Sequence, residues 1–182
     1  MNCNIQLIIE NTKVQLVPLV EEDFEDLYEV AADPLIWEQH PNKDRWKRDV
    51  FKTFFEGALK SKGAFKIVDK STNKVIGSTR FYDYNEQDQS ILIGYTFYAK
   101  KYWGTGTNLE VKKIMLDYIF QFVSVVYFHI GAENRRSQVA IVKLGTTKIA
   151  EQVVTYFGEQ PKLNYVYSLN KEEWFSKEPF AP

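Results

Sequence analysis

The sequence predicts an α/β domain in which one mixed sheet carries helices on both faces. Segments with the two-residue periodicity of strands alternate with segments of helical spacing, in the order β-α-α-β-β-β-α-β-α-β-β. The chain of 182 residues has an ordinary length for one domain, and no internal repeat, low-complexity tract or linker divides it. We therefore expect a single domain over residues 1–182.

The composition is that of a globular protein and argues against several classes of function. Hydrophobic residues make up 45% of the chain, and the net charge of −1 argues against a general nucleic-acid binder. No segment approaches the roughly 20 apolar residues that span a bilayer, and the apolar run 5–9 is too short for a signal peptide. The single cysteine, Cys3, cannot form an internal disulfide or a cysteine-based zinc site. We expect a cytoplasmic protein with no metal, membrane or nucleic-acid partner.

The chain begins with a predicted strand and a predicted helix. Residues 13–19 alternate between apolar and polar side chains, which is typical of a strand. Residues 21–33 place apolar side chains three and four positions apart and begin with an acid-rich turn that suits the helix dipole. The pair Asp33-Pro34 is expected to stop this helix, and residues 35–43 are predicted to be irregular.

A second helix and a hairpin are predicted next. The helix is expected over residues 44–63, beginning at an Asp44 cap and ending at Gly63. Residues 64–70 and 74–84 flank the turn sequence "STN" and predict an antiparallel hairpin. The apolar face of the helix is expected to consist of residues four apart: Trp46, Val50, Phe54 and Ala58.

The second half of the chain is predicted to alternate strands and helices before closing with two strands. The nearly apolar segment 90–100 is typical of a central strand, and residues 108–122 have strong helical periodicity. We expect a loose tail after residue 170. The remaining predicted elements are a strand at 124–132, a helix at 137–145 and paired strands at 148–156 and 163–170.

The loop "KYWGTG" at 101–106 joins the predicted central strand to the long helix. Gly104 and Gly106 allow the backbone to approach a ligand closely, and the helix that follows adds partial positive charge at its first turn. Lys100 and Lys101 strengthen the attraction for an anion. The sequence therefore predicts a phosphate-binding loop.

Three phosphate-binding motifs compete for this loop. A P-loop requires a Gly-Lys pair that does not follow Gly104, and a dinucleotide fingerprint requires a third glycine where Leu109 stands. The third pattern is the [Arg/Gln]-x-x-Gly-x-Gly/Ala pyrophosphate loop of acyl-CoA-dependent N-acetyltransferases. It matches with Lys101 in the Arg/Gln place.

The segments "WGTGTNLE" (103–110) and "NRRSQVAIVKLG" (134–145) resemble the core of the GNAT acetyltransferase superfamily. They are most similar to the branch that includes the RimJ/RimL-like ribosomal-protein N-acetyltransferases, and the other elements agree over nearly the whole chain. The resemblance implies a mostly antiparallel central sheet with a splayed parallel pair of strands. It also implies an enzyme that uses acetyl-CoA as cosubstrate and an amine as acceptor.

The resemblance assigns residues to coenzyme A. In the family the glycine loop holds the pyrophosphate through backbone N–H groups, the preceding strand pairs with the pantetheine arm, and a backbone N–H there faces the thioester oxygen. An asparagine after the next strand bonds the arm. Carried onto this sequence, and with basic residues nearby included, the expected cofactor residues are Tyr95, Thr96, Phe97, Lys101, Tyr102, Trp103, Gly104, Thr105, Gly106, Thr107, Asn134, Ser137 and Lys143.

Catalytic groups are less clearly marked in the sequence. Relatives often place a tyrosine acid eight residues after the asparagine, but that position is Val142 here, so Ser137 is the predicted partner of the leaving thiolate. Ser137 is also a candidate helix N-cap, and this role does not exclude the first. His40 is the predicted base. An α-amine, with a pKa of roughly 7.7–8.0, needs only a weak base. Glu38 and the pair Asp83/Tyr84 are alternatives.

The acceptor site is expected among the first two helices and the closing strands, where aromatic and acidic residues gather. The predicted wall residues are Trp37, Arg80, Tyr82 and Tyr84. Aromatic residues with acids nearby suit a cationic amine. A peptide or protein N-terminus is favoured, an aminosugar or polyamine is the alternative, and a non-catalytic acyl-CoA sensor is a further one. The protein is expected to be a monomer or homodimer.

Overall fold

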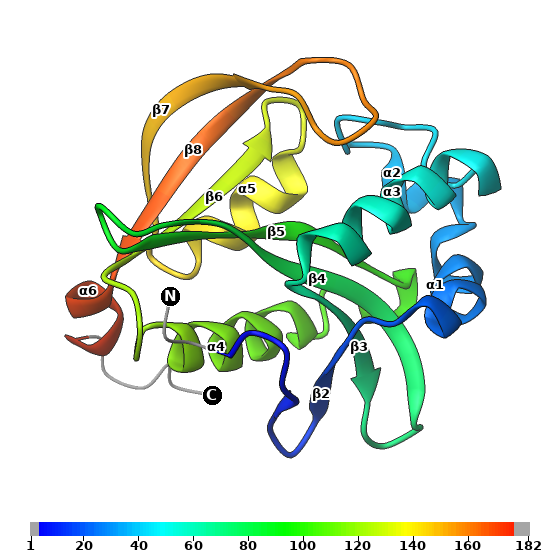
Figure 1. Cartoon of the computed structure of the whole chain (residues 1–182), viewed down its shortest axis with the longest axis horizontal. Coiled ribbons are helices and arrows are strands. Elements are labelled where there is room, and N and C mark those ends of the chain that lie inside the picture. The colour runs from blue at the N-terminus through cyan, green and yellow to red at the C-terminus, as the bar shows by residue number, and fades with distance from the viewer. Residues whose placement is uncertain (1–3, 177–182) are drawn as a thin grey trace.

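The computed structural model describes residues 4–176, whose strands form one eight-stranded sheet in the order β1-β2-β3-β4-β5-β6-β8-β7 (Figure 1). β5 (Ser90–Tyr98) and β6 (Val125–Gly131) are parallel, and the other neighbouring strands are antiparallel. The predicted fold class is confirmed. The remaining strands are β1 (Ile9–Glu10), β2 (Val14–Pro18), β3 (Ala64–Asp69), β4 (Lys74–Asn85), β7 (Thr147–Val154) and β8 (Lys162–Asn170).

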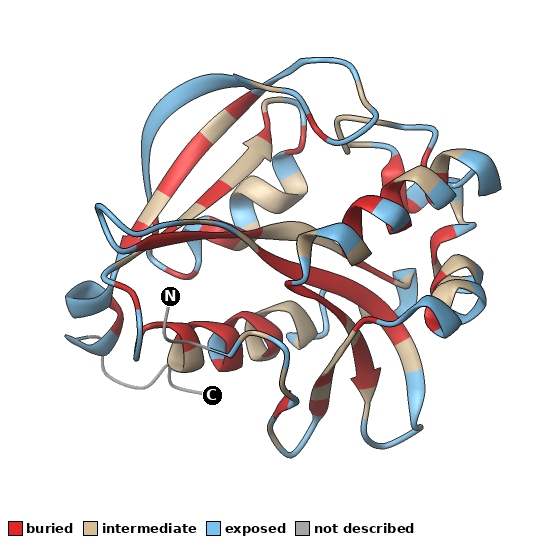
Figure 2. Ribbon diagram, viewed as in Figure 1, coloured by how far each residue is buried: buried red, intermediate tan, exposed pale blue. Residues whose placement is uncertain are grey.

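Helices cover both faces of the sheet and enclose two separate apolar clusters. On one face α1 (Phe24–Ala31), α2 (Pro34–Trp37) and α3 (Arg48–Ser61) pack around a cluster rich in phenylalanine. On the other face α4 (Thr107–Ile119) and α5 (Arg135–Val142) join a larger cluster, and α6 (Lys171–Ser176) adds Trp174 to it. Figure 2 shows these buried residues running along β3 to β5, while β7 is exposed over nearly its whole length. None of the helices that the structure describes is long and apolar enough to cross a bilayer.

A bulge interrupts the pairing of the two central strands. Ser78 lies opposite Phe97 and Arg80 lies opposite Gly94, so two residues of β5 face the single residue Thr79 of β4. An extra residue in one strand bends that strand and disrupts the local ladder. β5 is therefore reshaped close to the carboxyl end of its parallel segment.

The bulge also changes which face the side chains of β5 occupy. Ile93, before the bulge, packs in the cluster on the α4 face, whereas Tyr95 and Phe97 pack in the α3 cluster. Thr96 lies between them and reaches the α4 side, where its hydroxyl meets that of Thr79 at 2.9 Å. Tyr95 has a φ of 53°, a left-handed conformation that is strained for a residue with a Cβ.

β5 and β6 pair only over their first residues. Ser90–Leu92 pair with Val125–Tyr127, and no pairing between these strands follows in the residues described. The splayed parallel pair expected from the sequence is confirmed. The two strands diverge on the carboxyl side of this short ladder, which leaves backbone groups of both available to a ligand.

The first helix ends before Asp33-Pro34 as predicted, but the irregular segment 35–43 and the start of the next helix are predicted wrongly. Asp33-Pro34 does not lead into irregular chain, because the Asp33 carboxylate accepts the N–H of Leu35 at 3.0 Å and Pro34 begins the short helix α2. α3 begins at Arg48 rather than at an Asp44 cap, since residues 44–47 form a turn. That turn carries Trp46, which therefore lies outside the helix.

The end of α3 also differs from the prediction. Lys62, with a φ of 51°, takes the left-handed position that we expected of Gly63. Gly63 is needed for a different reason, because a Cβ there would lie 2.1 Å from the carbonyl oxygen of Phe81. The buried face of α3 is formed by Phe51, Phe54, Phe55, Gly57 and Ala58.

The ends of the chain add two elements that the sequence did not indicate. The short strand β1 pairs with β2, and α6 replaces part of the loose tail, held by Trp174 Nε1 donating to Asp117 at 2.7 Å. Cys3 and residues 177–182 lie outside the described residues.

We predict that Gly77→Ala destabilises the sheet at its centre. A Cβ on Gly77 would lie 2.0 Å from the carbonyl oxygen of Phe97 on β5, so the strands would have to separate. Overpacking of this kind costs about 1–3 kcal/mol of unfolding free energy, which urea denaturation measures. Lys74→Ala, on an exposed position of the same strand, is the control and should change stability little. Equal stability of the two variants would contradict this view of the strand contact.

Candidate active site

A cavity of about 480 Å³ lies where β5 and β6 separate. One set of lining residues, here called the loop group, comes from the loop before α4, the start of α4 and the two ends of α5: Gly104, Gly106, Asn108, Asn134, Ser137 and Lys143. A second set, the tyrosine group, comes from β4, β5, the turn before α3 and the β7–β8 loop: Arg45, Tyr82, Tyr95 and Tyr156. His40, Thr96, Phe97, Tyr102 and Trp103 also line the cavity.

The loop before α4 has the backbone that its glycines predict. Gly104 has a φ of 73° and Gly106 a φ of 86°, both in the left-handed region that favours glycine. Gly106 is the N-cap of α4 and, in the described structure, no side chain caps this helix end. The N–H groups of the first turn therefore remain available, and the helix dipole favours an anion there.

Aromatic residues next to the loop fix its position. The Tyr102 hydroxyl donates to Asp69 Oδ2 at 2.7 Å, and Trp103 Nε1 donates to the Tyr98 carbonyl at 3.2 Å. Hydrogen bonds from Ser71 and then Tyr102 lower the pKa of Asp69 to about 2, so this anchor is ionised at neutral pH. The loop is thus tied to the end of β3 and to the last residue of β5.

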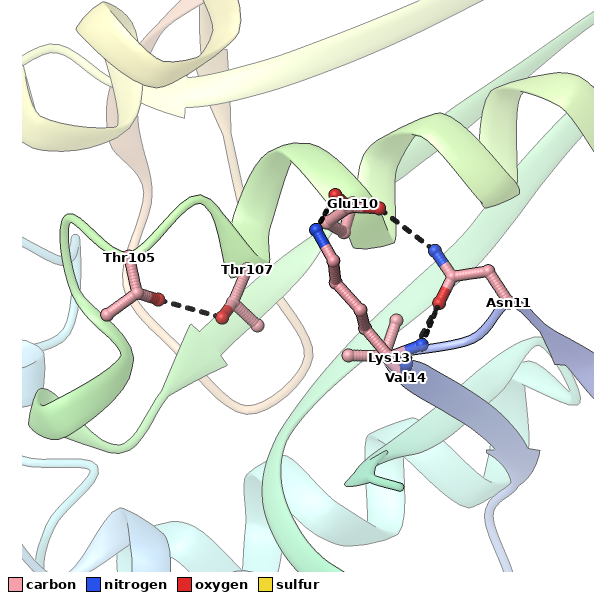
Figure 3. Close-up of polar contacts among 6 residues, drawn as sticks. All are labelled: Asn11, Lys13, Val14, Thr105, Thr107 and Glu110. Atoms are coloured by element: carbon pink, nitrogen blue, oxygen red, sulfur yellow. Dashed lines mark hydrogen bonds and ion pairs between the residues drawn. The ribbon is translucent and has the colours of Figure 1, made fainter. Parts of the chain in front are cut away.

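Glu110 braces the first turn of α4 against the N-terminal segment (Figure 3). Lys13 Nζ donates to Glu110 Oε1 at 2.7 Å, and Asn11 Nδ2 donates to Oε2 at 3.0 Å. Asn11 in turn accepts the N–H of Val14 at 2.9 Å, at the start of β2. The hydrogen bond from Lys13 lowers the pKa of Glu110 most, which favours the ionised carboxylate. Glu110 therefore holds the helix and does not face the cavity.

Lys112 is a lysine buried beneath the bulge of β5. Its side chain is 2% exposed, and its Nζ donates to Thr96 Oγ1 at 2.7 Å and Thr79 Oγ1 at 3.1 Å. No carboxylate pairs with it among the described residues. Burial lowers the pKa of Lys112 to about 7. Because Thr79 and Thr96 lie on the two strands at the bulge, these hydrogen bonds from Lys112 Nζ hold the irregular register.

The sequence left Ser137 two roles, as the N-cap of α5 or as the partner of the leaving thiolate, and the structure excludes the first. Asn134, rather than Ser137, is the N-cap, and its Oδ1 accepts the Ser137 N–H at 3.1 Å. Ser137 lies in the first turn, half-buried, with its side chain in the cavity lining. Its hydroxyl is therefore not used to cap the helix. Lys143, at the other end of α5, lines the cavity from an exposed position.

The tyrosine group is built from edge-to-face rings and a buried ion pair. The ring of Tyr95 lies 4.9 Å from that of Tyr82 and 5.3 Å from that of Tyr156. Arg45 donates from Nε and Nη2 to the two carboxylate oxygens of Glu159, at 2.7 and 2.8 Å. Bidentate pairs of this kind hold both partners in a fixed geometry. This ion pair ties the turn before α3 to the β7–β8 loop.

His40 borders the cavity as a neutral imidazole. Burial first, and then the positive charges of Arg45 and Arg136, lower the pKa of His40 to about 3. Its ring packs edge-on against Trp37 at 5.0 Å. A neutral imidazole can accept a proton, but this low pKa makes it a weak base.

The structure brings most of the predicted cofactor residues together but disperses the predicted acceptor wall. Trp37 is fully buried, and its Nε1 donates to the Ala31 carbonyl at 2.7 Å. Tyr84 packs against the cluster on the α4 face. Arg80 is buried behind Tyr95, so of the four wall residues Tyr82 alone lines the cavity. Lys101, Thr105 and Thr107 belong to the loop but are not part of the cavity lining.

Sequence reasoning missed several lining residues. Lys112 gave a signal, because it occupies the apolar stripe of α4, three residues before Met115. Arg45 and Tyr156 gave none, since only the tertiary fold brings the turn before α3 and the β7–β8 loop to one cavity. His129, on β6, is half-buried and also lines the cavity.

Comparison with known proteins identifies the fold and the family model that this chain matches. A model described as an acetyltransferase (GNAT) domain matches residues 13–147. Curated proteins give no match. A probable GNAT-family acetyltransferase from Chromobacterium violaceum superposes with a TM-score of 0.81 at 18% identity, over 93% of this chain and 89% of that one.

Two other solved structures carry more specific descriptions. A putative ribosomal-protein-serine acetyltransferase from Vibrio cholerae has a TM-score of 0.71 at 17% identity, over 92% of this chain and 99% of that one. A spermidine N-acetyltransferase from Vibrio cholerae, in complex with CoA and spermine, has a TM-score of 0.68 at 16% identity, over 91% and 99%. At these identities the likeness shows the fold alone.

We predict that Lys112→Met flattens the dependence of stability on alkaline pH. The pKa of Lys112 is about 7 in the folded chain and near 10.4 when unfolded, so the unfolded state binds more protons between these values. Wild-type stability should therefore rise with pH in this window, by up to about 1.4 kcal/mol per pH unit. Urea unfolding at pH 7 to 9.5 measures the slope.

The control for this prediction is Lys113→Met, which removes the exposed neighbouring lysine. It should keep the wild-type slope. A Lys112→Met protein with the same slope as wild type would show that this lysine titrates normally.

Proposed function

We propose, since this chain belongs to the GNAT acetyltransferase family, that it transfers an acetyl group from acetyl-CoA to a primary amine. Membership makes the protein an acyltransferase, and the acetyl donor and the amine acceptor are the finer parts of the proposal. The observation that carries it is the joining, in one cavity, of an uncapped helix N-terminus and the open edges of two splayed strands.

The cavity fits the chemical groups of coenzyme A. The first turn of α4 and the left-handed glycines offer backbone donors for a diphosphate. The diverging strand β5 offers unpaired backbone groups at Tyr95 to Phe97 for the amide-containing pantetheine arm. Asn134, whose Oδ1 is fixed by the Ser137 N–H, presents its amide group beside them. We propose that Lys101 and Lys143 add positive charge near the phosphates.

Direct transfer forms a C–N bond from the amine to the acetyl carbonyl and breaks the C–S bond of the thioester. The amine loses a proton and the leaving thiolate gains one. We propose that the Ser137 hydroxyl hydrogen-bonds the leaving sulfur, because it lines the cavity and does not cap its helix. His40 is the proposed acceptor of the amine proton. A weak base is sufficient when the attacking amine is already neutral.

For the acceptor, we propose a peptide or protein N-terminal amine, as in the RimJ/RimL-like branch. The sequence segments 103–110 and 134–145 support this choice, as does the similar fold of a protein described as a putative ribosomal-protein-serine acetyltransferase. A structure described as a spermidine acetyltransferase has the same fold, so a small amine is the alternative. The single cysteine supports a reducing compartment, and we propose the cytoplasm.

We predict that coenzyme A stabilises the protein against heat and that Gly106→Ala weakens this effect. A ligand at 100 times its dissociation constant adds about 2.7 kcal/mol to the unfolding free energy. A side chain at Gly106 strains the left-handed cap that points the amides of α4 outward. Thermal unfolding with increasing coenzyme A measures both effects.

Gly158→Ala is the matched control, because Gly158 also has a left-handed φ, of 70°, but does not line the cavity. It should lose basal stability and keep the coenzyme A shift. If wild type shows no shift at millimolar coenzyme A, the cosubstrate proposal fails.

We predict that Ser137→Ala lowers turnover more than acetyl-CoA binding. Loss of a hydrogen bond to the developing thiolate costs about 1.5–3 kcal/mol, which is roughly a 10- to 100-fold drop in kcat. Thiol release from acetyl-CoA in the presence of peptides, polyamines and aminosugars measures it. Ser124→Ala, at an exposed serine before β6, should keep wild-type kinetics. An unchanged kcat in Ser137→Ala would remove this hydroxyl from the reaction.

A further inference from the structure

The cavity is lined by positive but not by negative side chains. Among the described residues that line it, none is Asp or Glu, whereas four are Lys or Arg: Arg45, Lys112, Arg136 and Lys143. Lys143 belongs to the loop group, near the proposed phosphate site, but Arg45 belongs to the tyrosine group. The wall of the proposed acceptor site therefore offers no carboxylate to an ammonium group.

Three aromatic rings in or behind the cavity wall already hold the chain's own guanidinium groups. Arg80 lies over the ring of Tyr95, with its Cζ 3.9 Å from the centroid, and Arg136 lies over Trp103 at 3.9 Å. Arg45 lies 4.7 Å from the centre of Phe54. A ring face that holds a guanidinium is not available for a second cation. These ring faces are therefore not available to bind the ammonium group of an acceptor.

Arg80 is a buried charge without a carboxylate partner. Its side chain is 4% exposed, its Nη1 donates to the Gly57 carbonyl at 3.1 Å, and its Nε has no hydrogen-bond partner in the described structure. Burial lowers the pKa of Arg80 to about 10, so it stays charged at neutral pH. Asp83 is the one carboxylate that favours the charged form of Arg80, as the smallest of the causes acting on its pKa, and Asp83 is itself exposed.

Neutral donors accompany these charges. Burial raises the pKa values of Tyr82 and Tyr95, which keeps both hydroxyls protonated. Neither hydroxyl makes a hydrogen bond in the part of the chain that the structure describes, whereas the Tyr156 hydroxyl donates to Asn164 at 2.7 Å. The Arg45 charge is balanced by Glu159, so Arg80 leaves an excess of positive charge beside two unused hydroxyl donors.

We propose that the acceptor amine carries a carboxylate close to its amino group, and that the tyrosine group binds this carboxylate in the field of Arg80. This inference rests on the proposed acetyl transfer and names its substrate class. Two sources share the chemistry: a free α-amino acid, and a peptide whose first residue is acidic. It reverses the cationic acceptor that the aromatic and acidic sequence around this site suggests.

The same charges would assist the reaction. A positive field disfavours the ammonium form of a bound amine and lowers its pKa, so a larger fraction is the neutral nucleophile. The neighbouring His40 has a low pKa because of burial first, and then because of the positive charges of Arg45 and Arg136. A carboxylate on the acceptor offsets the cost of bringing a basic group into such a site. A site that keeps the bound amine neutral through its positive charge would not need a strong base.

Matched acceptors test the proposal on the wild-type protein. Thiol release from acetyl-CoA is measured with phenylalanine against phenylalaninamide, and with the peptide amides Asp-Ala-Ala and Asn-Ala-Ala. Spermidine and phenethylamine represent acceptors without a carboxylate. We expect kcat/KM at least about tenfold higher for the acidic member of one pair, as one charged hydrogen bond provides. Phenylalaninamide has the less basic amine, so a larger fraction of it is neutral and reactive at a given pH. A faster reaction of phenylalanine therefore cannot be due to amine ionisation.

Arg80→Met tests the origin of the preference. It should lower kcat/KM for the acidic acceptor about tenfold more than kcat/KM for the neutral acceptor. Arg48→Met is the matched control, since Arg48 also stacks on aromatic rings and pairs with Glu25 but is exposed and away from the cavity. Retained thermal stabilisation by coenzyme A shows that each variant is folded.

The outcomes separate this inference from the function on which it rests. If none of the tested amines supports thiol release from acetyl-CoA, the proposed function is overturned. Release with spermidine, phenethylamine or the neutral members at rates equal to or above the acidic ones would overturn the inference and leave acetyl transfer standing. A preference for phenylalanine identifies the free amino acid as the source, and a preference for Asp-Ala-Ala identifies the acidic peptide. Equal effects of Arg80→Met and Arg48→Met on the acidic acceptor would exclude the field of Arg80 as the cause.

Discussion

The bulge in β5 is the constraint on which the site depends. By placing two residues opposite Thr79, it reverses the alternation of side chains, so that Tyr95 and Phe97 turn to the α3 face and Thr96 turns to α4. The strand then bends away from β6 where their short parallel ladder ends. Without the extra residue, the aromatic side chains of the cavity and the open backbone edge would not lie on the same stretch of chain.

Two buried basic side chains lie on opposite sides of this bulge. Lys112 bonds the two threonines on the α4 side, and Arg80 covers the ring of Tyr95 on the other. Buried charges without carboxylate partners lower stability, and the left-handed Tyr95 adds strain. Destabilising features of this kind are common at functional sites. Here the buried side chains hold β5 in its irregular, splayed conformation. On this account Lys112 holds the backbone in place, and Arg80 sets the charge that the acceptor meets.

The sequence predicted the parts of the site that are local in the chain and missed those that are assembled by the fold. The loop with Gly104 and Gly106 could be identified because a strand, two glycines and a helix follow one another directly. Asn134 and Ser137 were predicted from the family resemblance of one short segment, and both line the cavity. Arg45 and Tyr156 were not, because a turn and a loop meet across more than a hundred residues. Trp37 was predicted to line the acceptor site but lies in the core. A large aromatic side chain suits either position, and the sequence pattern of so short a segment does not tell a core position from a cavity wall.

The most direct test of the account is a crystal structure of the protein with acetyl-CoA. The account predicts the diphosphate on the amides of residues 104–108 and the pantetheine arm along Tyr95 to Phe97, in the gap that separates β5 from β6. A complex in which the diphosphate lies elsewhere, or in which β5 and β6 close into a continuous ladder, would contradict it.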